Sequence, residues 1–128
     1  MKRSMLVLAV ALIALSGNTM AGFKTGQAVV INTSSRFVNA DLGYVRNTAD
    51  TTQYIGCEVY SSGSTPTAYC FARDAAGTYV ACSTSNSALV NVAASLKSDG
   101  YLYFQWDTSS NCTFIEQSTA SYTAPKGP

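Results

Sequence analysis

Cysteine, tyrosine and carboxylate side chains are the groups in this chain that could take part in chemistry. Its 128 residues include four Cys, eight Tyr and seven Asp plus Glu, but no His. The Ser/His/Asp and Cys/His nucleophile pairs are therefore excluded, as are histidine bases and histidine metal ligands. Neither GxGxxG nor GxxxxGKS/T occurs, so no phosphate-binding loop is predicted. We expect a protein that is not an enzyme and that holds no cofactor.

The spacing of the cysteines favours disulfides over a metal site. Successive cysteines lie 13, 12 and 30 residues apart, at Cys57, Cys70, Cys82 and Cys112. A zinc site typically has a CxxC pair or His ligands, and this chain has neither. An even number of Cys in a small exported domain is typical of a disulfide framework. We predict two disulfides and no metal.

A turn between the first two cysteines suggests which of them pair. The segment SSGSTP at 61–66 consists of turn formers and should reverse the chain. In an antiparallel hairpin centred between Gly63 and Ser64, the numbers of facing residues add up to 127. Cys57 then lies directly opposite Cys70.

A second turn leaves the pairing open. Residues 74–77 can also reverse the chain, which brings Cys82 near Cys70 as well. The sequence does not separate these options. We favour Cys57–Cys70 together with Cys82–Cys112, because the second bond then ties the early hairpins to the last one across a long loop.

The first 21 residues have the pattern of a signal peptide. Two basic residues precede an unbroken apolar run over 5–15, and the small residues Thr19 and Ala21 stand where a signal peptidase reads them. As a helix this run rises about 16 Å, against roughly 30 Å of hydrocarbon, so an anchor is the weaker alternative. We predict that residues 1–21 are removed, leaving no transmembrane anchor, and that the protein is periplasmic or secreted.

Composition predicts a nearly neutral domain whose surface is rich in hydroxyl groups. Charged residues make up 12% of the chain, with a formal net charge of +1, and 27 residues after position 21 are Ser or Thr. This balance excludes nucleic acid as a partner and leaves little repulsion against self-association. We expect a single exported β-rich domain at 22–121 and a flexible tail at 122–128, where Pro and Gly gather.

Short β-prone segments separated by turn residues predict a mainly β (α+β) fold. The clearest strand is 100–106, where Tyr and Gln alternate with Leu, Phe and Trp, so one face should be buried. Apolar residues at helical spacing after a capping Asn86 or Ser87 predict one short helix near 87–97. The predicted strands are 29–31, 53–60, 67–73, 78–83, 100–106 and 112–118, and residues 37–44 fit either a strand or a loop. The expected architecture is a small antiparallel sheet of two or three hairpins, stapled by disulfides.

Tyrosine is the side chain that suggests how such a domain could bind a partner. A phenol offers a flat apolar face and a hydroxyl group, which suits sugar rings, peptide backbones and protein subunits. Cross-strand packing is the alternative interpretation of these residues. The candidate binding surface comprises Tyr60, Tyr79, Tyr101 and Tyr103.

A resemblance is carried by the segments YIGCEVY, AYCFARDAAGTYVAC and SDGYLYFQWDTSSNCTFIE and the late APK. Over about residues 53–126 the chain resembles a set of small exported four-cysteine Gram-negative bacterial proteins of uncharacterised function. The resemblance implies an exported, disulfide-bonded domain and implies no catalytic or binding residue. The chain is also similar in size, export and β content to bacterial lysozyme inhibitors, but it lacks an inhibitory loop motif.

These observations lead to a hypothesis and several alternatives. The hypothesis is an exported non-enzymatic domain that binds a saccharide, an envelope component or a protein at or outside the cell envelope. The alternative is a structural surface subunit that self-assembles through strand edges. Weaker alternatives are an inhibitor of a host or competitor hydrolase, and an enzyme that uses Tyr or two carboxylates roughly 5 to 10 Å apart.

Overall fold

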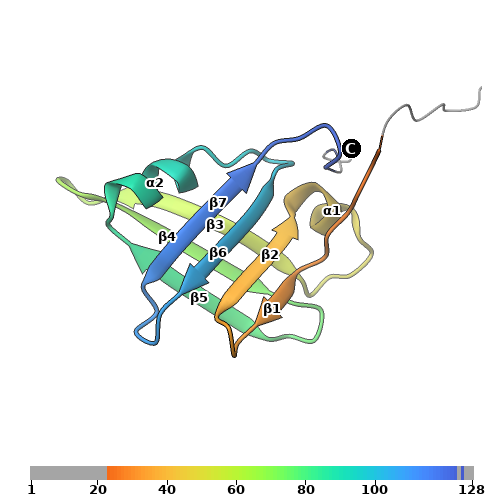
Figure 1. Ribbon diagram of the computed structural model, residues 1–128, viewed down its shortest axis with the longest axis horizontal. Coiled ribbons are helices and arrows are strands. Elements are labelled where there is room, and N and C mark those ends of the chain that lie inside the picture. Colours follow the sequence, from red (N-terminus) through yellow and green to blue (C-terminus); the bar gives the residue numbers. More distant parts are fainter. Residues whose placement is uncertain (1–22, 124, 126–128) are drawn as a thin grey trace, which may run out of the picture.

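Two antiparallel sheets lie one over the other in the computed structural model, which describes residues 23–123 and residue 125. Their strands cross in the view of Figure 1. The four-stranded sheet has the order β1 (Val30–Asn32), β2 (Phe37–Asp41), β6 (Tyr101–Trp106) and β7 (Cys112–Ser118). The three-stranded sheet has the order β3 (Tyr54–Ser61), β4 (Pro66–Arg73) and β5 (Tyr79–Thr84). The predicted signal peptide lies outside the described residues.

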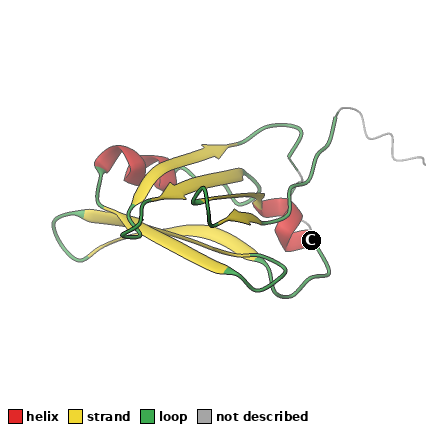
Figure 2. Ribbon diagram, turned by 60° about the horizontal axis from the view of Figure 1, so that its bottom comes forward, coloured by secondary structure: helices red, strands yellow, loops and turns green. Residues whose placement is uncertain are grey.

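The prediction of a mainly β, antiparallel, disulfide-bonded fold is confirmed, and every predicted strand is present to within one residue at each end. We expected one sheet, whereas the strands divide into two. The physical reason is that both hairpin systems have one apolar face, and each face is buried by the other. Figure 2 shows the two layers with the helices at opposite ends of the molecule.

Apolar residues that alternate along the strands form the core between the sheets. In β4, Ala68, Cys70 and Ala72 are fully buried. In β6, Leu102 and Phe104 are fully buried, as the alternation of this segment predicted. Side chains between these positions point away from the core, because successive residues of a strand face opposite sides. Each sheet therefore has an outer face.

The segment 37–44, which fitted either a strand or a loop, contains the whole of strand β2 and the start of a helix. Strand β2 ends at Asp41, and helix α1 (Leu42–Asn47) follows directly. The Leu42 backbone N–H donates to the Gly100 carbonyl at 2.9 Å, and Asp41 keeps an extended backbone at the helix start. Only tertiary contacts position a helix this short, so periodicity could not reveal it.

The predicted helix near 87–97 is present as α2 (Ser87–Ala94), but it ends three residues earlier. Its start follows the predicted cap, since the Asn86 side chain accepts hydrogen bonds from the Ala88 and Leu89 N–H groups. At the other end, the Ser95 hydroxyl donates to the Val92 carbonyl at 2.7 Å. This bond uses a carbonyl of the last turn and accompanies the end of the helix.

The disulfides are Cys57–Cys70 and Cys82–Cys112, the pairing that the sequence favoured. Facing residues of β3 and β4 have numbers that add up to 127, as the turn predicted. The second disulfide joins β5 to β7 and so links the two sheets. Cys70 lies directly opposite both Cys57 and Cys82 in the two neighbouring strands.

The first described residues meet the last ones beside the four-stranded sheet. The Thr25 backbone N–H donates to the Tyr122 carbonyl at 2.8 Å, and Thr25 forms a parallel bridge with Thr123. Thr123 is only 7% exposed, so the start of the predicted tail lies against the domain. Residues 124 and 126–128 lie outside the described residues. None of the helices in the described part is long and apolar enough to cross a bilayer.

Candidate functional site

Four aromatic rings gather on the outer face of the three-stranded sheet. They are Tyr54 from β3, Tyr69 and Phe71 from β4, and Tyr79 from β5, and we call this group the tyrosine face. The ring centroids of Tyr54 and Phe71 lie 6.1 Å apart, and those of Tyr69 and Phe71 lie 5.8 Å apart. No helix covers this side of the sheet in Figure 2. The rings therefore form one continuous surface that faces solvent.

Small neighbours make room for the central ring of the tyrosine face. Phe71 lies between Gly56 of β3 and Ala81 of β5 in the strand register. A Cβ atom at Gly56 would lie 3.4 Å from the tip of the Phe71 ring, so the ring extends over the backbone of β3. A larger residue at position 56 would compete with the ring for this space.

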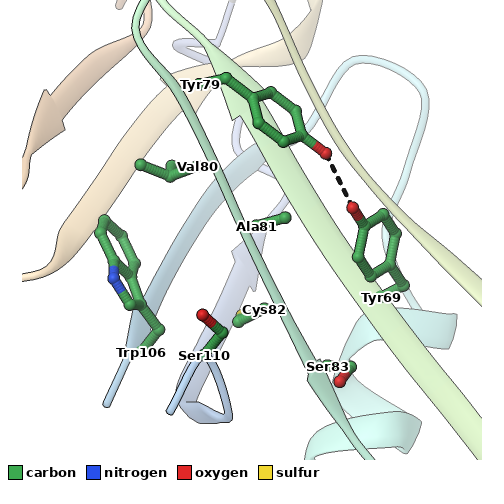
Figure 3. A pocket seen from close by; sticks show the side chains of 8 residues that line it. All are labelled: Tyr69, Tyr79, Val80, Ala81, Cys82, Ser83, Trp106 and Ser110. Atoms are coloured by element: carbon green, nitrogen blue, oxygen red, sulfur yellow. Dashed lines mark hydrogen bonds between the residues drawn. The ribbon is translucent and has the colours of Figure 1, made fainter. Parts of the chain in front are cut away.

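Two phenol groups of the tyrosine face are hydrogen-bonded to each other. The Tyr69 and Tyr79 hydroxyl oxygens lie 2.7 Å apart, as the dashed line in Figure 3 shows. This hydrogen bond, followed by burial, raises the pKa of Tyr79 to about 12. The Tyr54 phenol also acts to raise this pKa, whereas the Arg73 guanidinium lowers it. Three phenols and one guanidinium thus lie within electrostatic reach of one another.

Arg73 stands in the same cross-strand row as two of the tyrosines. It faces Tyr54 of β3 on one side and Tyr79 of β5 on the other. Its Nε atom is buried and has no hydrogen-bond partner within the described chain. The nearby carboxylate of Asp74 accepts a hydrogen bond from the Thr78 N–H at 2.8 Å, within its own turn. No described carboxylate pairs with Arg73.

A cavity of about 510 Å³ adjoins the tyrosine face along β5. It is lined by residues 79–83 together with Tyr69, Trp106 and Ser110. Figure 3 shows the two phenols on one side of the strand, with Trp106, Val80 and Ser110 on the other. Its lining residues therefore come from both faces of β5, from β4 and β6, and from the turn that follows β6.

One edge of β5 is open for part of its length. At the far end of the strand, the Ser83 N–H donates to the Ser110 carbonyl at 3.1 Å. Because hydrogen-bonding directions alternate along an antiparallel strand, the backbone groups of Ala81 point to the same side as those of Ser83. Within residues 23–123, no backbone group pairs with Ala81 on that side. Strand β5 also contains no charged residue.

The structure divides the predicted binding surface between the two sheets. Tyr79 belongs to the tyrosine face. Tyr60 lies on the same outer face but at the far end of β3, where it is 56% exposed and faces Thr67. Tyr101 and Tyr103 lie on the outer face of the four-stranded sheet and are half-buried. The four tyrosines therefore do not form one surface.

The outer face of the four-stranded sheet carries a second aromatic group. The ring of Tyr103 is stacked on Phe37 at 5.7 Å and meets the edge of Phe114 at 5.8 Å. A cavity of about 180 Å³ lies beside Tyr101, and Asp41 contributes to its lining. Burial raises the pKa of Asp41, and burial also raises the pKa of Tyr101. This cavity is about a third the size of the one along β5.

Sequence reasoning missed Tyr54, Tyr69, Phe71, Arg73 and Trp106 as site residues. The predicted register contained most of the signal, because it places Tyr54 opposite Arg73 and leaves Tyr69 and Phe71 on the same face. Counting in the same way from the turn at 74–77 gives facing numbers that add up to 151, which would have placed Thr78 opposite Arg73. The observed numbers add up to 152, with Tyr79 opposite Arg73. No local pattern could have shown that Trp106 of the other sheet approaches β5.

No protein-family model, curated protein or solved structure matches this chain. Among the side chains that the structure describes, no three or more of the His, Cys, Asp and Glu type gather as a metal site. The residues of the tyrosine face and their surroundings are thus the features of this chain that indicate a function.

Proposed function

We propose that this protein is an exported, non-enzymatic domain that binds a saccharide at the tyrosine face. The observation that carries the proposal is the group of four aromatic rings, with converging hydroxyl groups, on an uncovered face of a sheet. A sugar ring has one apolar side and a rim of hydroxyl groups. Aromatic faces bury the apolar side, and phenols exchange hydrogen bonds with the rim.

The rigidity of the surface supports this function. Tyr69 and Phe71 come from a strand whose inward residues are fully buried, and the Cys57–Cys70 disulfide joins that strand to β3. Side chains anchored in this way lose little conformational freedom when a ligand binds. A preformed face of this kind is suited to weak, repeated contacts with a polysaccharide.

Two features of the chain support export. Residues 1–21 have the pattern of a signal peptide, and two disulfides are typical of an oxidising compartment. The periplasm and the outer surface are also where bacterial polysaccharides are exposed.

A binding function fits the residues better than hydrolysis does. Glycoside hydrolysis uses two carboxylates on either side of the scissile bond. The outward-facing residues of β3, β4 and β5 include one carboxylate, Glu58, which faces Tyr69. A ligand lying on the tyrosine face would meet aromatic rings and hydroxyl groups.

The test is calorimetric titration of the oxidised protein with a panel of neutral and acidic trisaccharides. We expect saturable binding of at least one of them, and we expect Tyr54→Ala to weaken it about tenfold because one stacking ring is lost. The matched control is Phe114→Ala, which removes a similarly exposed ring from the other sheet. Failure of every trisaccharide to bind, or loss of binding with Phe114→Ala alone, would contradict the proposal.

The open edge of β5 favours a second candidate function, self-assembly through strand pairing. An unpaired edge without charged residues is the feature that natural proteins usually block with Lys, Pro or a bulge. Sedimentation velocity over a concentration series tests it. Oligomers that grow with concentration would support assembly, whereas a monomer at all concentrations would exclude it.

A further inference from the structure

Arg73 brings an unpaired positive charge into the tyrosine face. Its guanidinium is always protonated, and its Nε atom is buried without a hydrogen-bond acceptor among the described residues. The two terminal nitrogens of the guanidinium also have no partner among the described residues, and unlike Nε they are not buried. A bound anion would therefore meet the guanidinium at these nitrogens.

The neighbours of Arg73 determine which kind of anion fits. Tyr54 and Tyr79 face Arg73 from the two adjacent strands, each about 5 Å away across the sheet. An anion bound to the guanidinium therefore lies beside at least one aromatic ring. Glu58 lies further along β3, where it faces Tyr69, and it forms no ion pair with Arg73. The positive charge is thus at the Tyr54–Tyr79 end of the face and the negative charge at the other.

We propose that the tyrosine face selects saccharides of the uronic acid class and that Arg73 binds their carboxylate. This inference rests on the saccharide-binding function proposed above and names its substrate class. A hexuronate carries its carboxylate directly on the sugar ring, so the ring and the charge are separated by one bond. A uronate can therefore place its ring on Tyr54 or Tyr79 while its carboxylate meets the neighbouring Arg73 guanidinium. The guanidinium fork also fits a carboxylate through two parallel hydrogen bonds.

The probe is trigalacturonate, titrated into the oxidised protein at physiological ionic strength. Its fully methyl-esterified form has the same rings without the charges and serves as the matched ligand. We expect the acid to bind at least about tenfold more tightly than the ester, since a charge-assisted bidentate pair is lost on esterification. Inorganic phosphate at equal concentration should not displace the trimer.

Variants test whether Arg73 provides this selectivity. We expect Arg73→Gln to reduce the preference for the acid over the ester to about onefold, and Arg73→Lys to retain part of it because the charge remains without the fork. Arg36→Gln is the matched control, since Arg36 is an exposed arginine in the turn between β1 and β2. Thermal melts of each oxidised variant show whether the fold is retained, and Arg73→Lys keeps the test valid if Arg73→Gln does not fold.

The outcomes distinguish the two proposals. Equal binding of acid and ester, weakened in both cases by Tyr54→Ala, would overturn uronate selection and leave saccharide binding intact. An equal loss of acid binding with Arg36→Gln would show attraction by overall charge and also overturn it. Displacement by phosphate would identify a simple anion site and overturn it as well. If no acidic or neutral trisaccharide binds, saccharide binding fails and uronate selection fails with it.

Discussion

At the scale of single residues, Asp41 is a carboxylic acid held almost entirely out of water. Its side chain is 2% exposed, and its Oδ2 atom accepts a hydrogen bond from the Gln27 N–H at 2.9 Å. Burial raises the pKa of Asp41, and the bond from Gln27 offsets only part of this effect. The folded protein therefore holds the proton on Asp41 more tightly than the unfolded chain does. The stability that this provides is complete below pH 3.8 and is lost as the pH rises through the raised pKa.

We expect Asp41→Asn to be at least as stable as the natural protein at neutral pH, because it retains an acceptor for Gln27 and removes the buried charge. As the pH falls towards 4, the two proteins should become equally stable. Urea unfolding at several pH values measures this difference. The stability of the variant must be compared with that of the natural protein at each pH, because other groups also make stability depend on pH. Hydrogen bonds from Asn111 lower the pKa of Asp107, so its contribution changes with pH in the opposite direction to that of Asp41. A variant that is less stable at neutral pH by the same amount at every pH would contradict this account.

Tyr79 is the second residue whose shifted pKa makes the stability of the fold depend on pH. The hydrogen bond with Tyr69 is the largest reason why its pKa is raised to about 12. A raised phenol pKa contributes stability below pH 10.0, and this stability is lost as the pH rises towards 12. We expect Tyr69→Phe to return the pKa of Tyr79 towards 10.0, observed as loss of a step near pH 12 in a tyrosinate absorbance titration. Tyr60→Phe, at an exposed position without such a bond, should leave that step in place.

At the scale of elements, the two sides of β5 should respond differently to proline. The Ala81 N–H points to the open edge, whereas the alternation of the strand directs the Val80 N–H towards β4. We expect Ala81→Pro to cost less than about 1 kcal/mol of unfolding free energy and Val80→Pro to cost about 3 kcal/mol. Denaturant melts of both oxidised variants measure the difference. Equal losses would mean that the edge at Ala81 is already paired, by another copy of the chain or by a segment outside the described residues.

The elements also show how far the sequence could predict the fold. Local turns set the register of β3, β4 and β5, so the facing of Cys57 and Cys70 followed from counting residues. The pairing of β2 with β6 joins segments about sixty residues apart, and no local turn specifies it. For this reason the division into two sheets was not predicted. Tyr101 and Tyr103 were grouped with Tyr79 because chain order does not show which sheet a strand joins.

The candidate site was predictable only in part for a related reason. Tyr79 was recognised by its residue type alone. Arg73 was missed because a single charged residue at a strand end is usually solvated. Its importance depends on the lack of a hydrogen-bond partner for its guanidinium among the described residues, which is a property of the folded protein.

At the scale of the whole molecule, the two disulfides contribute differently to stability. Cys57–Cys70 closes a 13-residue separation within one sheet, and Cys82–Cys112 closes a 30-residue separation between the two sheets. In the chain-entropy model their removal costs roughly 3 and 4 kcal/mol. We therefore expect the double Cys82→Ala, Cys112→Ala variant to melt at a lower temperature than the double Cys57→Ala, Cys70→Ala variant. The reverse order in calorimetry would show that strain or denatured-state structure outweighs loop length.

The row of three cysteines across β3, β4 and β5 has a consequence for biosynthesis. Cys70 has a thiol partner on either side, so a chain that has formed only these three strands can oxidise in two ways. The bond between Cys70 and Cys82 would leave Cys57 and Cys112 as orphan thiols on strands of different sheets. Correct maturation then requires thiol–disulfide exchange once β7 has emerged and brought Cys112 to Cys82. The yield of native protein should thus depend on the disulfide isomerase of the compartment in which the chain folds.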